Sequence, residues 1–282
     1  MEKLVCKKAN KSVLDFITQE ITDISYNTLQ KLLRKKDVKV NGTRIKQDQS
    51  VDINDVVEVY VNIKNNQIEV VYQDDDIVVV NKPVNIEVVS LDCECLHNKL
   101  EKQLNIKLYA VHRIDRNTTG LVIFAKTEKI KDILETAFKN HTIKKYYLCV
   151  VCGEPAKPSA KLVAYHKKDA NKSMCYILDN KAEGYSKIIT IYKTIKTNSL
   201  LSLLQVEIQT GKTHQIRAHL AHIGHAILGD QKYGNKQLNK QYKTNKQLLT
   251  AYKLDFSNIK EYAFNVKTIE LSDAIKKYKD LV

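Results

Sequence analysis

The stretch His112-Arg-Ile-Asp-Arg-Asn-Thr-Thr-Gly-Leu-Val-Ile-Phe-Ala-Lys126 joins a polar loop to a short, unbroken apolar run. The apolar run, residues 121–125, is rich in branched and aromatic side chains and is bounded by a glycine and a lysine, which favours a buried strand over a buried helix. Residues 115–120 are turn formers and predict a loop. Asp115 therefore lies on a loop anchored by a buried strand, which suits a carboxylate that acts as a nucleophile or a base.

Two arginines flank this carboxylate in the sequence. Arg113 precedes Asp115 and Arg116 follows it, and nearby guanidinium groups favour the ionised form of a carboxylate. An aspartate that only caps a turn between two exposed arginines would show the same pattern. On this stretch alone, the structural interpretation is the stronger of the two.

The composition indicates a polyanionic partner. At 282 residues the chain can hold one large domain and one small domain. Lys and Arg outnumber Asp and Glu by 46 to 32, which suits nucleic acid better than an acidic membrane surface. The sequence shows no apolar run of transmembrane length, no signal core within residues 1–12 and no disulfide-like framework among its six cysteines. We therefore expect a cytoplasmic protein without a membrane partner.

The choice of basic residue is strongly biased toward lysine. Of the 46 basic residues, five are Arg and the remaining 41 are Lys. Only arginine offers a planar fork that can form two parallel hydrogen bonds. We therefore expect arginine to be kept where lysine would not serve. The five arginines are Arg34, Arg44, Arg113, Arg116 and Arg217.

Residues 12–60 predict a small α/β unit of two helices and a hairpin. Helical spacing places apolar side chains on one face of each helix, and Ser25 is a candidate N-cap of the second. The inward residues we expect are Val13, Phe16, Ile17 and Ile21 in the first helix, and Tyr26, Leu29, Leu32 and Leu33 in the second. Alternation around Asn41-Gly42 predicts the hairpin. A generic unit with a solvated charged face would show the same periodicity.

This order of elements resembles the S4 RNA-binding domain, although Lys36-Asp37 and Asn54-Asp55 depart from its usual turns. The resemblance implies that RNA binds the basic second helix and the hairpin, so that Arg34, Lys35 and Arg44 contact it. A polar linker, residues 61–69, would then lead to a catalytic domain at residues 70–282.

Within residues 70–282 we expect mainly strands, with two helices between them. A strand should end at Pro83, and in a strand over 145–153 period two places Tyr147 on the same face as Cys149. Thr213 is expected to cap a helix that carries Arg217 in its first turn and ends at Gly224. The other expected segments are a strand at 77–82, a helix at 128–140, a hairpin region at 154–185, strands at 188–192, 200–208 and 248–256, and a surface loop at 235–247.

Three segments of this unit resemble the large-subunit ribosomal RNA type (RluA/RluD-like) of pseudouridine synthases. They are the stretch at 112–126, the Lys-x-Tyr strand at 145–153 and the run Thr-Gly-Lys-Thr-His-Gln-Ile-Arg-Ala-His at 210–219, which Gly-Asp and Tyr follow downstream. Asn85, Lys212, Ala226 and Thr250 stand where this family usually has Gly, Arg, Pro and His. Asn can replace that glycine if the backbone is left-handed there.

The resemblance implies an α+β fold, a mixed and largely antiparallel sheet with flanking helices, behind the S4-like unit. It implies isomerisation of uridine to pseudouridine in RNA, with ribosomal RNA as the first candidate and transfer RNA as the second. Asp115 would be the catalytic residue, Tyr147 would stack on the uracil, and the fork of Arg217 would hold Asp115. The residues expected to contact RNA or the base are Arg113, Arg116, Lys212, His214 and Leu228. We expect a monomer without a cofactor.

Metal binding and two other functions are less well supported. The histidines between 214 and 225 have no neighbouring Glu to act as a base, Cys149 and Cys152 should point to opposite faces of a strand, and Cys93-x-Cys95-x-His97 lacks a second ligand pair. We therefore expect no metal site. A non-catalytic ribosome-assembly factor with a decayed site is the alternative function, whereas a glycosidase-like hydrolase would need a second carboxylate.

Overall fold

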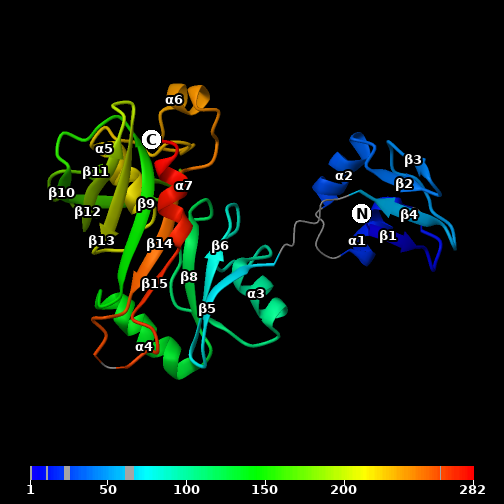
Figure 1. The fold of residues 1–282 in the computed structure, drawn as a ribbon, viewed down its shortest axis with the longest axis horizontal. Coiled ribbons are helices and arrows are strands. Elements are labelled where there is room, and N and C mark those ends of the chain that lie inside the picture. Colours follow the sequence, from blue (N-terminus) through cyan, green and yellow to red (C-terminus); the bar gives the residue numbers. More distant parts are fainter. Residues whose placement is uncertain (1, 11, 22–25, 61–66, 261) are drawn as a thin grey trace. The chain divides into compact units, whose positions relative to one another are not determined.

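The computed structural model describes residues 2–10, 12–21, 26–60, 67–260 and 262–282. The chain divides into two compact units, Met1–Gln67 and Ile68–Val282 (Figure 1). The proposed N-cap Ser25 and residues 61–66 of the expected linker lie outside the described residues. No helix in the described ranges is long and apolar enough to cross a membrane.

The first unit packs two helices against a small antiparallel sheet, whose strand order is β1-β4-β2-β3. Its elements are β1 (Glu2–Val5), α1 (Val13–Glu20), α2 (Tyr26–Arg34), β2 (Val38–Val40), β3 (Thr43–Arg44) and β4 (Val56–Val59). Ser12 caps α1 by accepting a hydrogen bond from the backbone N–H of Asp15. Apolar side chains from both helices meet the sheet in one core.

The expected hairpin of this unit is confirmed, and one helix face differs from expectation. Asn41 and Gly42 both have positive φ, 50° and 80°, as the tight turn between two paired strands requires. Tyr26 was expected inside but is 49% exposed, because the first residue of α2 projects beyond the core that Leu29 and Leu33 reach. Strand β1 was not predicted, since Glu-Lys-Leu-Val has no clear alternation.

The second unit is built on one mixed sheet, which confirms the predicted fold class. In the described ranges it has eleven strands, with the main path β11-β10-β12-β13-β9-β14-β8-β6-β5, while β7 pairs with β8 and β15 with β14 (Figure 1). Its strands are β5 (Glu69–Gln73), β6 (Ile77–Lys82), β7 (Tyr109–Ala110), β8 (Thr119–Ala125), β9 (Lys144–Cys152), β10 (Ser159–Asp169), β11 (Met174–Leu178), β12 (Ser186–Thr197), β13 (Leu201–Ile208), β14 (Leu249–Asp255) and β15 (Thr268–Glu270). Its helices are α3 (Leu96–Leu104), α4 (Glu128–Lys139), α5 (Gln215–His222), α6 (Lys236–Gln241) and α7 (Ser272–Lys279).

The strand pairs of this sheet are antiparallel except where β14 meets β8. At that parallel contact Gly120 has φ 108°, and a Cβ built on it would lie 2.1 Å from the carbonyl oxygen of Ala251. No side chain fits in that space, and this φ also favours glycine. The glycine therefore allows β8, which follows the Asp115 loop, to lie directly against β14.

Helices cover both faces of the sheet. The central strands alternate as predicted, so Tyr147 and Cys149 face a core shared with α3 and α5. Cys152 faces a separate core that includes Tyr278 of α7. The Cys149 and Cys152 thiols thus lie on opposite faces, as expected.

Two local expectations for this unit are wrong. Thr213 does not cap α5, because His214 takes the N-cap position in a left-handed conformation, φ 53°, and the Gln215 side chain accepts the hydrogen bond from the Lys212 N–H. Residues 235–247 are not only a surface loop, since α6 lies within them. In α6, Asn239 is buried because its side-chain oxygen accepts a hydrogen bond from the N–H of Gly229.

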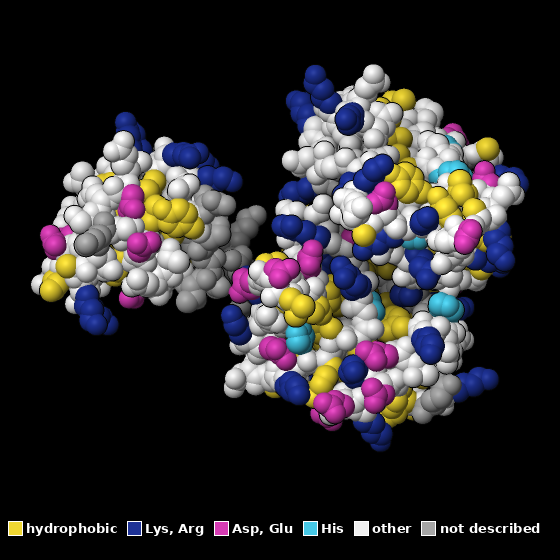
Figure 2. Space-filling view, turned by 180° about the vertical axis from the view of Figure 1, so that it is seen from behind, with side chains coloured by type: hydrophobic (Ala, Val, Ile, Leu, Met, Phe, Trp, Pro, Cys, Tyr) yellow, Lys and Arg dark blue, Asp and Glu magenta, His cyan; other side chains and the backbone are white. Residues whose placement is uncertain are grey.

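Lys and Arg side chains are spread across the displayed face of each unit (Figure 2). This agrees with the excess of basic over acidic residues in the sequence.

Candidate active site

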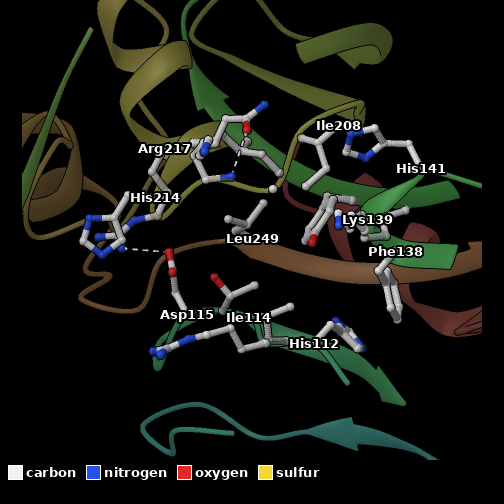
Figure 3. Close-up of a pocket in the computed structure, with 18 residues that line it drawn as sticks. His112, Ile114, Asp115, Phe138, Lys139, His141, Ile208, His214, Arg217 and Leu249 are labelled. Carbon is white, nitrogen blue, oxygen red and sulfur yellow. Dashed lines mark hydrogen bonds and ion pairs between the residues drawn. The ribbon is translucent and has the colours of Figure 1, made fainter. Parts of the chain in front are cut away.

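A pocket of about 380 Å³ in the second unit contains the predicted catalytic residues. Its wall is formed by the Asp115 loop, the end of α4, the start of β9 and the loop that leads into α5. Asp115, His214 and Arg217 lie at one end, while Phe138, Lys139 and His141 lie at the other (Figure 3).

The Asp115 loop is fastened at several points before it enters β8. The N–H of Thr118 donates a hydrogen bond to the backbone oxygen of Asp115 at 3.0 Å, which closes a turn. The Gln247 side chain donates to the Thr118 hydroxyl at 2.7 Å. The loop is therefore tied to the chain segment just before β14, and the Asp115 side chain stays 23% exposed to the pocket.

Lys82 is a third residue that holds the Asp115 loop in place, and its role was not predicted from the sequence. Its side chain is fully buried at the end of β6, and its ammonium donates to the backbone oxygens of Pro83, Ile86 and Arg116 at 2.9, 2.9 and 3.0 Å. Burial lowers the pKa of Lys82 to about 8, against the opposing effect of Asp115. The available signal was the Asn-Lys-Pro sequence at the strand end, where a lysine stops a buried strand.

Arg217 lies between two carboxylates. Its Nη1 donates to Asp115 Oδ2 at 3.1 Å, while Nε and Nη2 donate to the two oxygens of Asp230 at 2.6 and 3.0 Å. The Asp115–Arg217 pair expected from the sequence is thus present. The expectation that the fork of Arg217 holds Asp115 is wrong. The fork donates to both oxygens of Asp230, and only Nη1 reaches Asp115.

Asp230 holds the arginine in place. Its side chain is fully buried, and it also accepts hydrogen bonds from the backbone N–H groups of Lys232 and Tyr233 at 2.8 and 3.2 Å. Although burial opposes the charge, the Arg217 partner and these N–H groups lower the pKa of Asp230. Burial also opposes the charge of Arg217, but Asp230, and after it Asp115, raise the Arg217 pKa. Arg217 and Asp230 therefore form a charged pair at neutral pH, with one guanidinium nitrogen directed to Asp115.

Two aromatic side chains lie beside this ion pair. The guanidinium carbon of Arg217 is 5.3 Å from the centre of the Tyr233 ring, a favourable cation–π distance. The Tyr233 hydroxyl accepts from the N–H of Cys175 at 2.7 Å and lies 3.0 Å from Nδ1 of His214. Burial lowers the pKa of His214 to about 4, although Asp115 acts in the opposite direction. His214 is therefore a neutral neighbour of the carboxylate near pH 7.

Tyr147 forms part of the pocket wall close to Asp115. Its side chain is 7% exposed, and among the described residues none forms a hydrogen bond with its hydroxyl. Burial, and after it the charge of Asp115, raise the Tyr147 pKa above its usual value. The phenol therefore stays neutral and presents an aromatic surface.

The other predicted residues divide into those that line this pocket and those that do not. Arg113 and Lys212 line it. Arg116 is not among the lining residues and instead donates to the backbone oxygen of Asn85 at 3.2 Å, and Asn85 has the expected left-handed backbone with φ 68°. The prediction that Leu228 lines the pocket is wrong.

Leu228 lies elsewhere because its backbone pairs with Val150 and Leu248, which directs its side chain into the core on the far face of β9. Leu249 lines the pocket instead. The signal for Leu249 was the predicted closing strand, whose alternation places neighbouring leucines on opposite faces. Arg34, Lys35 and Arg44 are exposed residues of the first unit.

The histidines that suggested a metal site have other partners. His219 is buried with Nδ1 3.0 Å from the hydroxyl of Thr190, and His222 lies 2.8 Å from the exposed carboxylate of Asp179. In the described part of the chain, no cluster of three or more His, Cys, Asp or Glu side chains has a geometry suited to a metal ion.

Comparison with known proteins gives consistent matches. The family model described as RNA pseudouridylate synthase matches residues 76–222. An uncharacterized RNA pseudouridine synthase of Mycoplasma pneumoniae is 30% identical over 93% of this chain and 90% of its own. The ribosomal large subunit pseudouridine synthase C of Vibrio vulnificus is 28% identical over 89% of this chain and 86% of its own. The structure of human RNA pseudouridylate synthase domain containing 4 superimposes with a TM-score of 0.60 at 20% identity, covering 72% of this chain and 88% of that one.

Proposed function

Because the chain belongs to the RNA pseudouridylate synthase family and is a pseudouridine synthase, we propose that it isomerises uridine in large-subunit ribosomal RNA with Asp115 as the essential carboxylate. The observation that carries this proposal is the contact between Asp115 and Arg217, whose guanidinium is itself clamped by the buried Asp230. The similarity to large-subunit pseudouridine synthase C proteins supports the choice of RNA.

The reaction rearranges bonds without a net change in composition. The bond between C1′ and N1 of the uracil breaks, the base turns, and a bond between C1′ and C5 forms, while C5 loses a proton and N1 gains one. Asp115 supplies the only carboxylate among the residues that line the described pocket. Attack on the sugar, attack on the base and removal of a sugar proton are the three roles open to it. In each, Arg217 would fix the orientation of the carboxylate before the substrate binds.

The pocket is suited to a base that has left its stack. Ile114, Ile216 and Leu249 supply apolar lining, and Tyr147 supplies an aromatic surface. Enzymes that act on a base commonly hold it against such side chains after extruding it from the helix. The raised pKa of Tyr147 favours a stacking role over proton transfer by a phenolate.

We assign RNA binding outside the pocket to the first unit, as an S4-like domain spanning residues 12–60. The exposed Arg34 and Lys35 at the end of α2 and Arg44 in the hairpin support this assignment. Transfer RNA is the second candidate substrate. The proposal includes a monomeric protein that acts in the cytoplasm.

The test of the essential carboxylate is Asp115→Asn, which is nearly isosteric. The variant should bind ribosomal RNA like the wild-type protein but lose at least about a thousandfold in turnover, because the reacting group is gone. Release of tritium from C5-labelled uridine in large-subunit RNA measures the turnover. If the Asp115→Asn variant kept more than a few per cent of the activity, this role would be refuted.

The same assay separates the enzyme from the alternative of a non-catalytic assembly factor. That alternative predicts that the wild-type protein binds RNA but releases no tritium from any RNA. Turnover on transfer RNA alone would keep the chemistry and change the proposed substrate.

A further inference from the structure

The end of the pocket farther from Asp115 has no role in the chemistry described above. Phe138 and Lys139, the last residues of α4, lie there with His141 (Figure 3). Lys145 at the start of β9 and Gly211 in the loop before α5 also line the pocket.

The ammonium group of Lys145 is a mostly buried cation without an anionic partner among the described residues. No described carboxylate lies within 4 Å of it, whereas the other buried cation of this pocket, Arg217, contacts two. Its neighbours are the Phe138 ring, 5.3 Å away, and Gly211, where a Cβ would lie 3.5 Å from Nζ. Burial lowers the pKa of Lys145, and no neighbouring negative charge opposes that shift.

The groups around Lys145 add positive potential and no negative charge. Burial, and after it Lys145 itself, lower the pKa of His112 to about 3 and also lower that of His141. Both histidines are therefore neutral near pH 7. The exposed side chains of Lys139 and Lys212 line the same pocket.

The carbonyl oxygens at the end of α4 do not serve as hydrogen-bond partners of the Lys145 ammonium. A helix C-terminus carries partial negative charge on its last carbonyl groups. Here the oxygen of Ala137 accepts from the N–H and hydroxyl of Thr142, and the oxygen of Phe138 accepts from the N–H groups of Asn140 and His141. No hydrogen bond from Lys145 to these oxygens is formed within the described residues.

A buried charge without a counter-ion is costly, so it is usually paired or awaits a ligand. A uridine held at Asp115 stays attached to its strand through two phosphates, which must leave the pocket through its wall or mouth. We propose that this end of the pocket binds a phosphodiester next to the isomerised uridine, with Lys145 as its charged ligand and neutral His141 as a hydrogen-bond donor. This inference rests on the proposed function.

The test compares Lys145→Met with Lys144→Met. Methionine keeps the length of the side chain and removes the charge, and Lys144 is the neighbouring residue of β9 that does not line the pocket. Pseudouridine formation in large-subunit RNA would be measured at several salt concentrations. Lys145→Met should raise KM about tenfold with kcat changed less than twofold, and flatten the plot of log kcat/KM against log salt by about 0.7 to 0.9. Lys144→Met should match the wild-type protein.

A second measurement does not depend on the RNA target. Uridine and uridine 3′,5′-bisphosphate would be titrated into each protein and followed by NMR chemical shifts. The bisphosphate should bind at least about tenfold more tightly than uridine to the wild-type protein, to Lys144→Met and to Lys145→Arg. For Lys145→Met the two affinities should agree within about twofold.

The outcomes separate this inference from the proposed function. An active wild-type enzyme with an unchanged KM, salt slope and bisphosphate preference in Lys145→Met would overturn the phosphate site alone. A fall in kcat without a rise in KM would also overturn it and would assign Lys145 to the chemistry. Absence of wild-type turnover with an intact bisphosphate preference would overturn the proposed function and keep the anion site.

Discussion

The two ends of the pocket differ in how their buried positive charges are paired. At one end, Arg217 contacts both Asp115 and Asp230, so its charge is compensated within the protein. At the other end, Lys145 has no anionic partner among the described residues. Under the two proposals above, Asp115 is oriented before the substrate arrives, whereas the positive charge of Lys145 is neutralised by a phosphate of the substrate.

The orientation of Arg217 depends on Asp230 as well as on Asp115. Asp230 accepts hydrogen bonds from Nε and Nη2 of Arg217, and Asp115 accepts one from Nη1. The partly exposed Asp115 is thereby held by a group that the substrate does not have to position. Preorganisation of this kind reduces the cost of aligning a reacting group.

Acidification should have the largest effect on the stability of the folded state, through His112 and His214 in the pocket wall and the buried His219 outside it. Burial lowers the pKa of His112 to about 3 and those of His214 and His219 to about 4. Between pH 6.5 and 5 the unfolded chain binds protons at these positions and the folded chain does not. The free energy of unfolding should therefore fall as the pH falls, by up to about 1.4 kcal/mol per pH unit for each of His112 and His219, and by less for the half-buried His214, because solvent screens its charge. Urea unfolding at pH 6.5, 5.8 and 5.0 measures this, and a flat profile would contradict it.

Removing the charge that clamps the arginine should be the next largest effect. Asp230→Asn leaves Arg217 buried with the partly exposed Asp115 as its only carboxylate partner among the described residues. The free energy of unfolding should fall by about 3 kcal/mol, as is typical when a buried ion pair loses one charge. Asp179→Asn is the control, because that carboxylate is 81% exposed beside His222, and it should change stability by less than about 0.5 kcal/mol. Equal effects of the two variants would remove the contrast between the ends of the pocket.

Replacing the arginine by lysine tests whether a point charge is enough at the paired end. A lysine ammonium cannot donate to both oxygens of Asp230 and also reach Asp115 in the same geometry. Arg217→Lys should therefore cost about 2 kcal/mol or more in transition-state stabilisation, about thirtyfold in kcat/KM. The opposite change, Lys212→Arg in the same pocket, should stay within about twofold of the wild-type enzyme. A fully active Arg217→Lys enzyme would show that the retained arginine has no special role.

Tyr147 lies on the pocket wall, and removal of its hydroxyl group should have the smallest effect of the changes considered. Tyr147→Phe keeps the aromatic surface, so its kcat/KM should stay within about threefold of the wild-type value. Tyr147→Leu removes a stacking surface worth about 1–3 kcal/mol per base. Kinetics of both variants on the same RNA measure the difference. If the two variants were equally active, Tyr147 would belong to the core and not to the site.

The sequence predicted the central elements of the fold well, because their patterns are local. Residues 121–125 are apolar throughout and are fully buried in β8, and helix α4 begins and ends within one residue of expectation. The errors occurred where tertiary contacts decide the outcome. Asn239 lies in a polar stretch, yet it is buried because it satisfies the backbone of Gly229.

The sequence predicted which side chains would lie together but not the geometry of their contacts. Asp115, Tyr147 and Arg217 lie in one pocket, as motif positions implied. That Arg217 directs its fork to Asp230 could not be read from the sequence, because both carboxylates lie within motifs and only the path of the backbone selects between them. Lys82 was missed since its partners are carbonyl oxygens, which every residue carries.

The position of β14 has a consequence for the synthesis of the protein. This strand lies between β8 and β9, and the bond from Gln247 to Thr118 joins residues 129 positions apart. A chain still on the ribosome with residues only up to 248 would hold the Asp115 motif but leave two facing sheet edges unpaired, and such edges promote association between chains. Contacts so distant in sequence also slow folding. The enzyme should therefore acquire its active site only late in translation, and fragments that end before Leu249 should be inactive and prone to aggregate.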